Sequence, residues 1–215
     1  MQPSLSDSSF THASAAYQTY FKDISYAPFI NGVLQNIAAG TSMLPAQVAP
    51  GFSTSSPIIT CVSTMPDPHE SPVPFSPYIS AITAGYQHCR SDPTGAIGAY
   101  IQGTPLIVLC PLFWGVSAKP TRKVCNRVNE ATNQFQSDGL SLVNTQVSVL
   151  LHELVHFYSE AASGVQVTHE GIRLNDCVGL NAEQSRLNPN NYVYYVFSTS
   201  LPPGLFELSL LIEIK

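Results

Sequence analysis

Two histidines and a glutamate stand at a spacing that suits a metal ion. His152, Glu153 and His156 form the pattern His-Glu-x-x-His. On an α-helix, residues four apart lie one turn above each other. Both imidazoles can then bind one zinc ion while the carboxylate beside them faces a water molecule near the metal. This pattern is typical of zinc-dependent peptidases, so we expect His152 and His156 to be metal ligands and Glu153 to be the catalytic base.

The residues around the motif indicate a helix with two different faces. With 100° per residue and His152 at zero, His156 falls at about 40°. The apolar residues of the same segment fall in an arc of roughly 160° to 300°, which we expect to pack into the core. That arc consists of Val143, Val147, Leu150, Leu151, Leu154, Val155 and Tyr158.

Length and composition indicate one domain with an extracellular character. Of the 215 residues, 44% are hydrophobic, so we expect a single domain whose residues 1–40 are helical and whose residues 41–215 hold the remaining elements. Only 11% are charged, far below the usual quarter, which favours a secreted protein. The net charge of −5 and the lack of a Lys/Arg cluster exclude nucleic acid and an anionic membrane surface as primary partners. We expect a monomer that acts on a protein or peptide.

The cysteines favour the same oxidising compartment. The chain has five, Cys61, Cys89, Cys110, Cys125 and Cys177, with no Cys-x-x-Cys pair, so disulfides are the better interpretation than a zinc ribbon. The first residues lack the basic start and apolar core of a signal peptide, and we interpret the chain as one that follows a missing leader. No apolar run is long enough to span a membrane.

Periodicity and turn residues predict the following elements. We expect long loops around a few strands between residues 40 and 95, and a C-terminal half that is mostly helical. The predicted helices are Ala13–Asp23, Pro28–Ala39, Asn129–Gln136, the motif helix and Val178–Leu187, and the predicted strands include Pro57–Val62 and Leu106–Cys110. The aromatic series Tyr192, Tyr194, Tyr195 and Phe197 should pack in the core, and His12, His69 and His88 should lie on the surface.

Four segments in order resemble one peptidase family. They are Ala15–Asp23, Leu106–Phe113 with Cys125, Ser148–His156 and Asn188–Tyr195. In this order and spacing, the chain resembles the deuterolysin-type (aspzincin) peptidases, a largely fungal group of secreted zinc endopeptidases. The resemblance implies an α+β, zincin-like fold with a small sheet over the active-site helix, and one bound Zn²⁺.

The resemblance also gives a candidate for the third zinc ligand. In the family an aspartate in a Gly-Thr-x-Asp-x-x-Tyr-Gly segment holds this place. Aligning its threonine with Thr168 puts Glu170 at the ligand position, although the other signature residues are absent. Aspartate and glutamate both bind zinc through oxygen at similar distances, so Glu170 is the expected ligand. His169 and Asp176 are the alternatives.

The comparison with that family and the spacing of the cysteines give two further expectations. The family tends to carry a tyrosine that assists the oxyanion where this chain has Phe113, and losing one such donor typically costs about 10² to 10³ in rate. The alternative function is therefore a weak or inactive zincin-like protein that binds zinc or a partner. We also expect a disulfide between Cys110 and Cys125, with a pair of Cys61 and Cys89 as a weaker assignment and Cys177 left unpaired.

Overall fold

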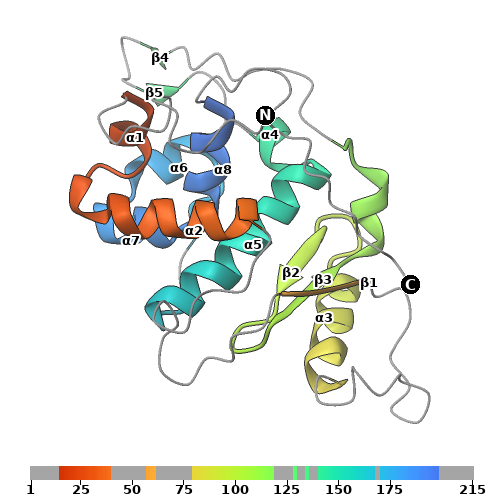
Figure 1. Ribbon diagram of the computed structural model, residues 1–215. Helices are drawn as coiled ribbons and strands as arrows, with labels where there is room; N and C mark the ends of the chain where they lie inside the picture. Colours follow the sequence, from red (N-terminus) through yellow and green to blue (C-terminus); the bar gives the residue numbers. More distant parts are fainter. Residues whose placement is uncertain are drawn as a thin grey trace, which may run out of the picture.

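One long helix lies between a group of helices and a small sheet (Figure 1). The computed structural model describes residues 15–39, 57–61, 79–118, 128–129, 134–135, 140–167 and 170–198. Its elements are α1 (Ala15–Tyr20), η2 (Ile24–Tyr26), α2 (Ala27–Ala39), β1 (Ile58–Cys61), α3 (Ile79–Ser91), β2 (Gly98–Tyr100), β3 (Leu106–Leu109), η5 (Pro111–Gly115), β4 (Val128–Asn129), β5 (Gln134–Phe135), α4 (Leu140–Val143), α5 (Gln146–Ser163), α6 (Leu174–Gly179), α7 (Ala182–Leu187) and α8 (Pro189–Ser198). The predicted α+β class, mostly helical with a small sheet, is confirmed.

The sheet has the strand order β1-β3-β2, with β1 parallel and β2 antiparallel to β3. Successive side chains of a strand point to opposite faces, and β3 buries both sets. Ile107 and Leu109 belong to the main core with α5, whereas Leu106 and Val108 pack with α3. The predicted strand at this position is confirmed, and its continuous apolar run reflects burial on both faces.

Helix α5 begins and ends with recognisable caps. The Thr145 side chain accepts a hydrogen bond from the Ser148 backbone N–H. At the other end, Gly164 has a φ of 67°, a left-handed conformation that favours glycine, and its N–H donates to the Glu160 carbonyl at 2.7 Å. These caps fix where the helix stops and where the chain turns back.

The burial of α5 differs from the expected two-faced pattern. Leu150, Leu151, Leu154, Val155 and Tyr158 are buried as predicted, and so is Val143, which belongs to α4. Val147 is only partly buried. The face that carries the histidines is largely buried too, and Glu153, His156 and Glu160 are at most 8% exposed. The reason is that α2 and α8 cover one side of α5 while β2 covers the other.

Aromatic rings join the first and last described helices. Tyr192, Tyr194 and Tyr195 on α8 are at most 1% exposed, which confirms their predicted core position. Their rings meet those of α1 and the residue after it, in the pairs Tyr17–Tyr195, Tyr20–Tyr194, Phe21–Tyr192 and Phe21–Tyr195. Such pairs contribute about 0.5–1.5 kcal/mol each beyond the area they bury. They hold α8 in place behind α5.

Two predicted helices were wrong or incomplete. The helix expected at Asn129–Gln136 is instead the antiparallel pair β4–β5, in which Val128 faces Phe135. Asparagine is a poor helix former, and the backbone bonds across the two strands replace those of a helix. The helix expected at Val178–Leu187 is interrupted, because Asn181 caps the start of α7 and forms a capping box with Gln184.

Helix α3 and strand β2 are two further elements that the sequence patterns did not reveal. Both precede β3, and the region expected to hold loops and a few strands contains the whole of α3. Gly85 lets this helix approach the sheet, because a Cβ there would lie 2.6 Å from Val108 Cγ2. The predicted strand near Pro57–Val62 is confirmed as β1.

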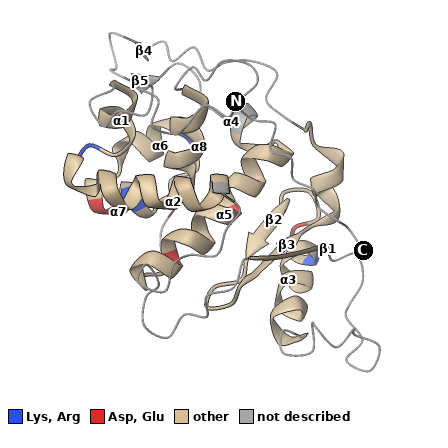
Figure 2. Cartoon of the chain, in the orientation of Figure 1, with Lys and Arg blue, Asp and Glu red and all other residues tan. Residues whose placement is uncertain are grey.

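Charged side chains are sparse on the described elements (Figure 2). The described basic residues come from separate elements: Lys22 follows α1, Arg90 lies on α3, Arg173 precedes α6 and Arg186 lies on α7. Within the described part of the chain, the helices are too short or too polar to cross a membrane.

The disulfide joins cysteines other than those expected. Cys89 on α3 bonds to Cys110 at the end of β3, with Cα atoms 5.3 Å apart. Both predicted pairings, Cys110–Cys125 and Cys61–Cys89, are therefore wrong, because the packing of α3 on β3 brings a different pair together. Among the described cysteines, Cys61 is an exposed thiol and Cys177 a buried one, and Cys125 lies outside the described residues.

Replacing Cys89 with serine should lower the free energy of unfolding by about 3 kcal/mol, because the disulfide closes a loop with a sequence separation of 21. Urea unfolding without reductant measures the change. Cys61→Ser is the matched control and should change the stability by less than about 0.5 kcal/mol. Non-reducing peptide mapping that joins Cys110 to Cys125 would contradict the observed pairing.

Candidate metal centre

The two motif histidines lie on one side of α5 with their ring nitrogens turned to a common point. His152 Nε2 and His156 Nε2 are 3.2 Å apart, and the ring centroids are 4.9 Å apart. The His152 side chain is 18% exposed and that of His156 10%. The side chains are thus largely enclosed yet still reachable from solvent.

Glu170 completes a group of three potential ligands. After Gly164 the chain turns back beside α5, and one Glu170 oxygen lies 2.9 Å from His156 Nε2 while the other lies 3.3 Å from His152 Nε2. In a tetrahedral site with bonds of about 2.05 Å, neighbouring ligand atoms lie about 3.3 Å apart. The spacing of these side chains therefore suits a small divalent cation, and these three residues form a possible metal-binding group.

The other two candidates for the third ligand have different outcomes. Asp176 is exposed on α6 and does not join the group formed by the described histidines and Glu170. His169 lies outside the described residues. Among the described candidates, Glu170 is thus the one that the fold brings to the histidines.

The Glu153 carboxylate lies beside this group but points toward the sheet. It is 6% exposed, and its Oε2 accepts a hydrogen bond from the Tyr100 backbone N–H at 2.6 Å. Gly98 on the same strand also comes close, since a Cβ there would lie 3.6 Å from Glu153 Oε1 and 3.1 Å from Val149 Cγ1. Strand β2 therefore both encloses and orients this carboxylate.

Asn190 fixes the orientation of one histidine ring. Its side-chain N–H₂ donates to the Gly171 carbonyl at 3.0 Å, which turns its Oδ1 toward His152 Nδ1 at 3.1 Å. Because an amide oxygen only accepts, Nδ1 of His152 must carry the hydrogen, and the Nε2 lone pair is left for a metal. Buried on α8, Asn190 thus selects the tautomer that a metal ligand needs.

The residue after Glu170 is held by several donors. The Gly171 carbonyl accepts hydrogen bonds from Asn190, from the Asn188 side-chain amide at 3.2 Å and from the Cys177 thiol at 3.1 Å. A Cβ at Gly171 would lie 3.0 Å from the Cys177 backbone nitrogen, which is tighter than almost all real contacts. Only glycine fits here without displacing α6, and the position of Glu170 follows from this close approach.

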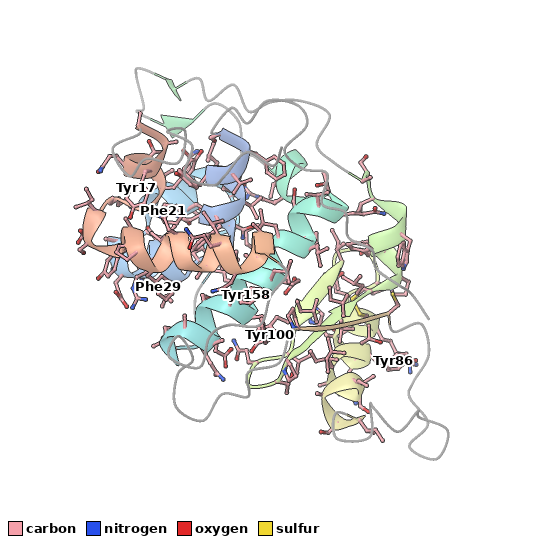
Figure 3. The ribbon with its side chains drawn as sticks, viewed as in Figure 1. Tyr17, Phe21, Phe29, Tyr86, Tyr100 and Tyr158 are labelled. Carbon is pink, nitrogen blue, oxygen red and sulfur yellow. A yellow bond between two sulfur atoms is a disulfide. The ribbon has the colours of Figure 1, made fainter. Side chains whose placement is uncertain are left out.

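Tyr100 contacts the His156 ring, and Glu160 interacts with Tyr100. The Tyr100 ring lies between the sheet and α5 (Figure 3) and stacks on the His156 ring, with centroids 6.0 Å apart and an angle of 18°. Burial, followed by the negative charge of Glu160, raises the pKa of Tyr100 well above its usual value. The hydroxyl therefore stays protonated across the physiological range.

The ionisable groups of the site support one another electrostatically. Burial opposes protonation of His152, but its hydrogen bond to Glu170 and the charges of Glu153 and Glu170 outweigh this and raise its pKa to about 8. Burial also disfavours the Glu170 carboxylate, yet its hydrogen bonds to His152 and His156 hold its pKa well below the usual range. Without a metal, a carboxylate and a protonated imidazole form an ion pair here.

Sequence reasoning did not assign roles to Asn190, Tyr100 or Glu160. Glu160 had a detectable signal, because it follows His156 by four residues and falls at about 80° on the same helix face. Asn190 is polar within an aromatic segment, which is a weaker signal of a buried hydrogen-bonding role. Tyr100 had none, since its place depends on how β2 packs against α5.

No family model and no curated protein matches the chain. Phe113, which stands at the expected oxyanion position, is 4% exposed and its ring packs against that of Trp114.

The metal-free protein should be most stable in weakly acidic solution. His152 has a raised pKa of about 8, so its stabilising charge is fully present below pH 6.5 and is lost as the pH rises through 8. Glu170 has a lowered pKa, so its contribution is present above about pH 4.5 and is lost as the pH falls. We expect the free energy of unfolding to drop by about 2 kcal/mol between pH 6 and pH 9. Urea unfolding of the chelator-treated protein at each pH measures this free energy. A free energy of unfolding that does not change with pH in the wild type would contradict the prediction, as would an equal drop in His152→Gln.

Asn190→Ala should weaken metal binding by about 10- to 100-fold, because the His152 ring loses the acceptor that fixes its tautomer. Competition with a coloured chelator measures the dissociation constant. Asn190→Asp keeps an acceptor and should retain most of the affinity. Equal affinities for the alanine variant and the unchanged chain would rule out this role of Asn190.

Proposed function

We propose that this protein is a zinc-dependent endopeptidase with a zincin-like fold. The observation that carries the proposal is the near-tetrahedral spacing of the three side chains, 3.2, 3.3 and 2.9 Å between their nearest atoms, next to a buried glutamate on the same helix. Two imidazoles and one carboxylate are a common ligand set of catalytic zinc, with the fourth position left for water or substrate. The same set also occurs in iron(II) oxygenases, so the motif glutamate is what favours peptide hydrolysis.

His152, His156 and Glu170 would hold the metal. When bound, zinc supplies Lewis acidity toward a peptide carbonyl and makes an adjacent water acidic near neutral pH. Glu170 reaches the histidines as a carboxylate, because its lowered pKa keeps it ionised at neutral pH. Asn190 accepts from Nδ1 of His152, so that Nε2 is the nitrogen that becomes free to bind when the protonated ring loses a proton.

Glu153 would transfer the proton of the attacking water in the proposed hydrolysis. Taking His152 as zero, Glu153 falls at about 100° around the helix and His156 at about 40°, so the carboxylate borders the ligand group. Its Oε2 is occupied by the Tyr100 N–H, which leaves Oε1 as the proton acceptor. Glu153 accepts a proton from the attacking water and then delivers it to the leaving amine.

The arrangement around α5 supports the zincin-like part of the proposal. A small sheet borders the helix on the side of the motif glutamate, and α8 supports it from behind. This agrees with the expectation from the deuterolysin-type family, although Phe113 supplies no hydroxyl. The proposed activity should therefore be about 10² to 10³ lower than that of an enzyme with such a donor.

The proposed substrate is a protein or peptide outside the cell, cut by a monomeric enzyme. The disulfide between α3 and β3 supports an oxidising compartment, because cytosolic proteins rarely keep structural disulfides.

Metal analysis and three variants test the function together. Plasma mass spectrometry after dialysis should find close to one zinc per chain, and Glu170→Ala should lose it while Asp176→Ala keeps it. Glu153→Gln should retain the zinc but lower cleavage of a denatured protein substrate by at least about 10³-fold, because no other base among the described residues is placed to take the proton.

Three outcomes would count against the proposal. Iron in place of zinc would contradict the assignment of the metal, and normal cleavage by the Glu153→Gln variant would contradict the mechanism. Zinc bound at one equivalent by a chain that cleaves nothing would favour a zinc-binding protein without peptidase activity, the alternative that Phe113 supports.

A further inference from the structure

The hairpin formed by β2 and β3 is attached to α5 through two buried carboxylates. Glu153 accepts the Tyr100 N–H, and Glu160 accepts the Gly103 N–H at 3.1 Å. The two glutamates are separated by two helical turns, about 10.5 Å along the axis. The hairpin is thus fixed against the helix at two points rather than by apolar contact alone.

Glu160 is a buried acid that the proposed reaction does not use. It is 5% exposed, and the ligand group is formed by other residues. A buried carboxylate is costly unless several donors satisfy it. Here the same oxygen that accepts from Gly103 also accepts from the Gln166 side-chain amide at 3.3 Å, and the charge of Glu160 acts on Tyr100.

Gln166 connects this acid to the segment that leads to Glu170. Residues 164–167 follow the end of α5, and Gln166 bonds back to the helix through Glu160. A second link joins the same segment to the hairpin, since Gln102 donates to the Val167 carbonyl at 3.2 Å. Glu160 therefore lies at the junction of three parts: α5, the hairpin and the segment before Glu170.

The turn of the hairpin is shaped for this contact. Gly103 has a φ of 73°, in the left-handed region, and nothing lies within 4 Å of where its Cβ would be. Glycine is thus required here by the backbone conformation rather than by crowding. That conformation presents the Gly103 N–H to the Glu160 carboxylate, where a charge-assisted hydrogen bond forms.

We propose that Glu160 is a positioning residue that sets both sides of the metal centre. Through Gln166 it fixes the segment that delivers Glu170, and through Gly103 it holds the hairpin so that Tyr100 keeps its stack on His156 and its hydrogen bond to Glu153. This role deepens the proposed function and rests on it for its catalytic consequence. Its effect on the hairpin and on the segment 164–167 is a property of the chain itself.

The first test compares Glu160→Ala, Glu160→Gln and a control, Glu183→Gln, which removes a carboxylate from an exposed ion pair with Arg186 on α7. Zinc dissociation constants come from chelator competition, far below the unfolding temperature. The alanine variant should bind zinc at least about tenfold more weakly, because residues beyond the ligands typically change affinity 10- to 100-fold. The glutamine variant keeps an oxygen acceptor and should stay close to wild type, as should Glu183→Gln.

A second test needs no metal. Hydrogen–deuterium exchange of the chelator-treated protein should be at least about tenfold faster at the Tyr100 N–H in Glu160→Ala, although Glu160 does not touch that amide. Gln166→Ala, a change at an exposed residue, should loosen the segment before Glu170 without affecting Tyr100. If Glu160→Ala fails to fold, hydrogen–deuterium exchange of residues 164–167 in Gln166→Ala still tests the link between Glu160 and this segment.

The outcomes separate this inference from the proposed function. Unchanged zinc affinity and unchanged Tyr100 exchange in a folded Glu160→Ala variant, with lower stability alone, would mean that Glu160 only supports the fold and would overturn the inference. A wild-type chain that binds no zinc would contradict the proposed function, and the exchange experiment would still decide the role of Glu160.

Discussion

A buried polar group must find a hydrogen-bonding partner, and α5 carries several buried polar side chains. The helix is enclosed by other helices on one side and by β2 on the other, so Glu153, His156 and Glu160 are all removed from most of the solvent. Each of the two acids is satisfied by a backbone N–H of the neighbouring hairpin. The placement of the sheet against the helix therefore follows from the need to satisfy these carboxylates as much as from apolar packing.

The same constraint explains how α8 contributes. Its aromatic residues anchor it to α1, and the asparagines at its start are then buried and must be satisfied by protein groups. Asn188 and Asn190 both donate to the Gly171 carbonyl, and Asn190 also accepts from His152. The Gly171 carbonyl oxygen thus links the position of Glu170, the residue before it, to the orientation of the His152 ring.

The sequence alone was sufficient where a local pattern is strong. The His-Glu-x-x-His helix, the apolar strand at Leu106–Leu109 and the buried aromatic series follow from periodicity and residue type. The pairing of Cys89 with Cys110 could not be read in this way, because it requires α3 to pack on the sheet. Glu170 was found through an alignment of one threonine, whereas the contacts of Tyr100 and Asn190 arise only when distant segments meet.

The ion pair between Glu170 and the histidines has a consequence for how the protein matures. Many small metal sites have no structure until the metal arrives, because their ligands repel or disperse. Here the two Glu170 oxygens lie 3.3 and 2.9 Å from the two ring nitrogens, which is nearly the spacing that a cation requires. A cation that binds here would replace the proton of His152, and the three side chains would need to move little to reach it.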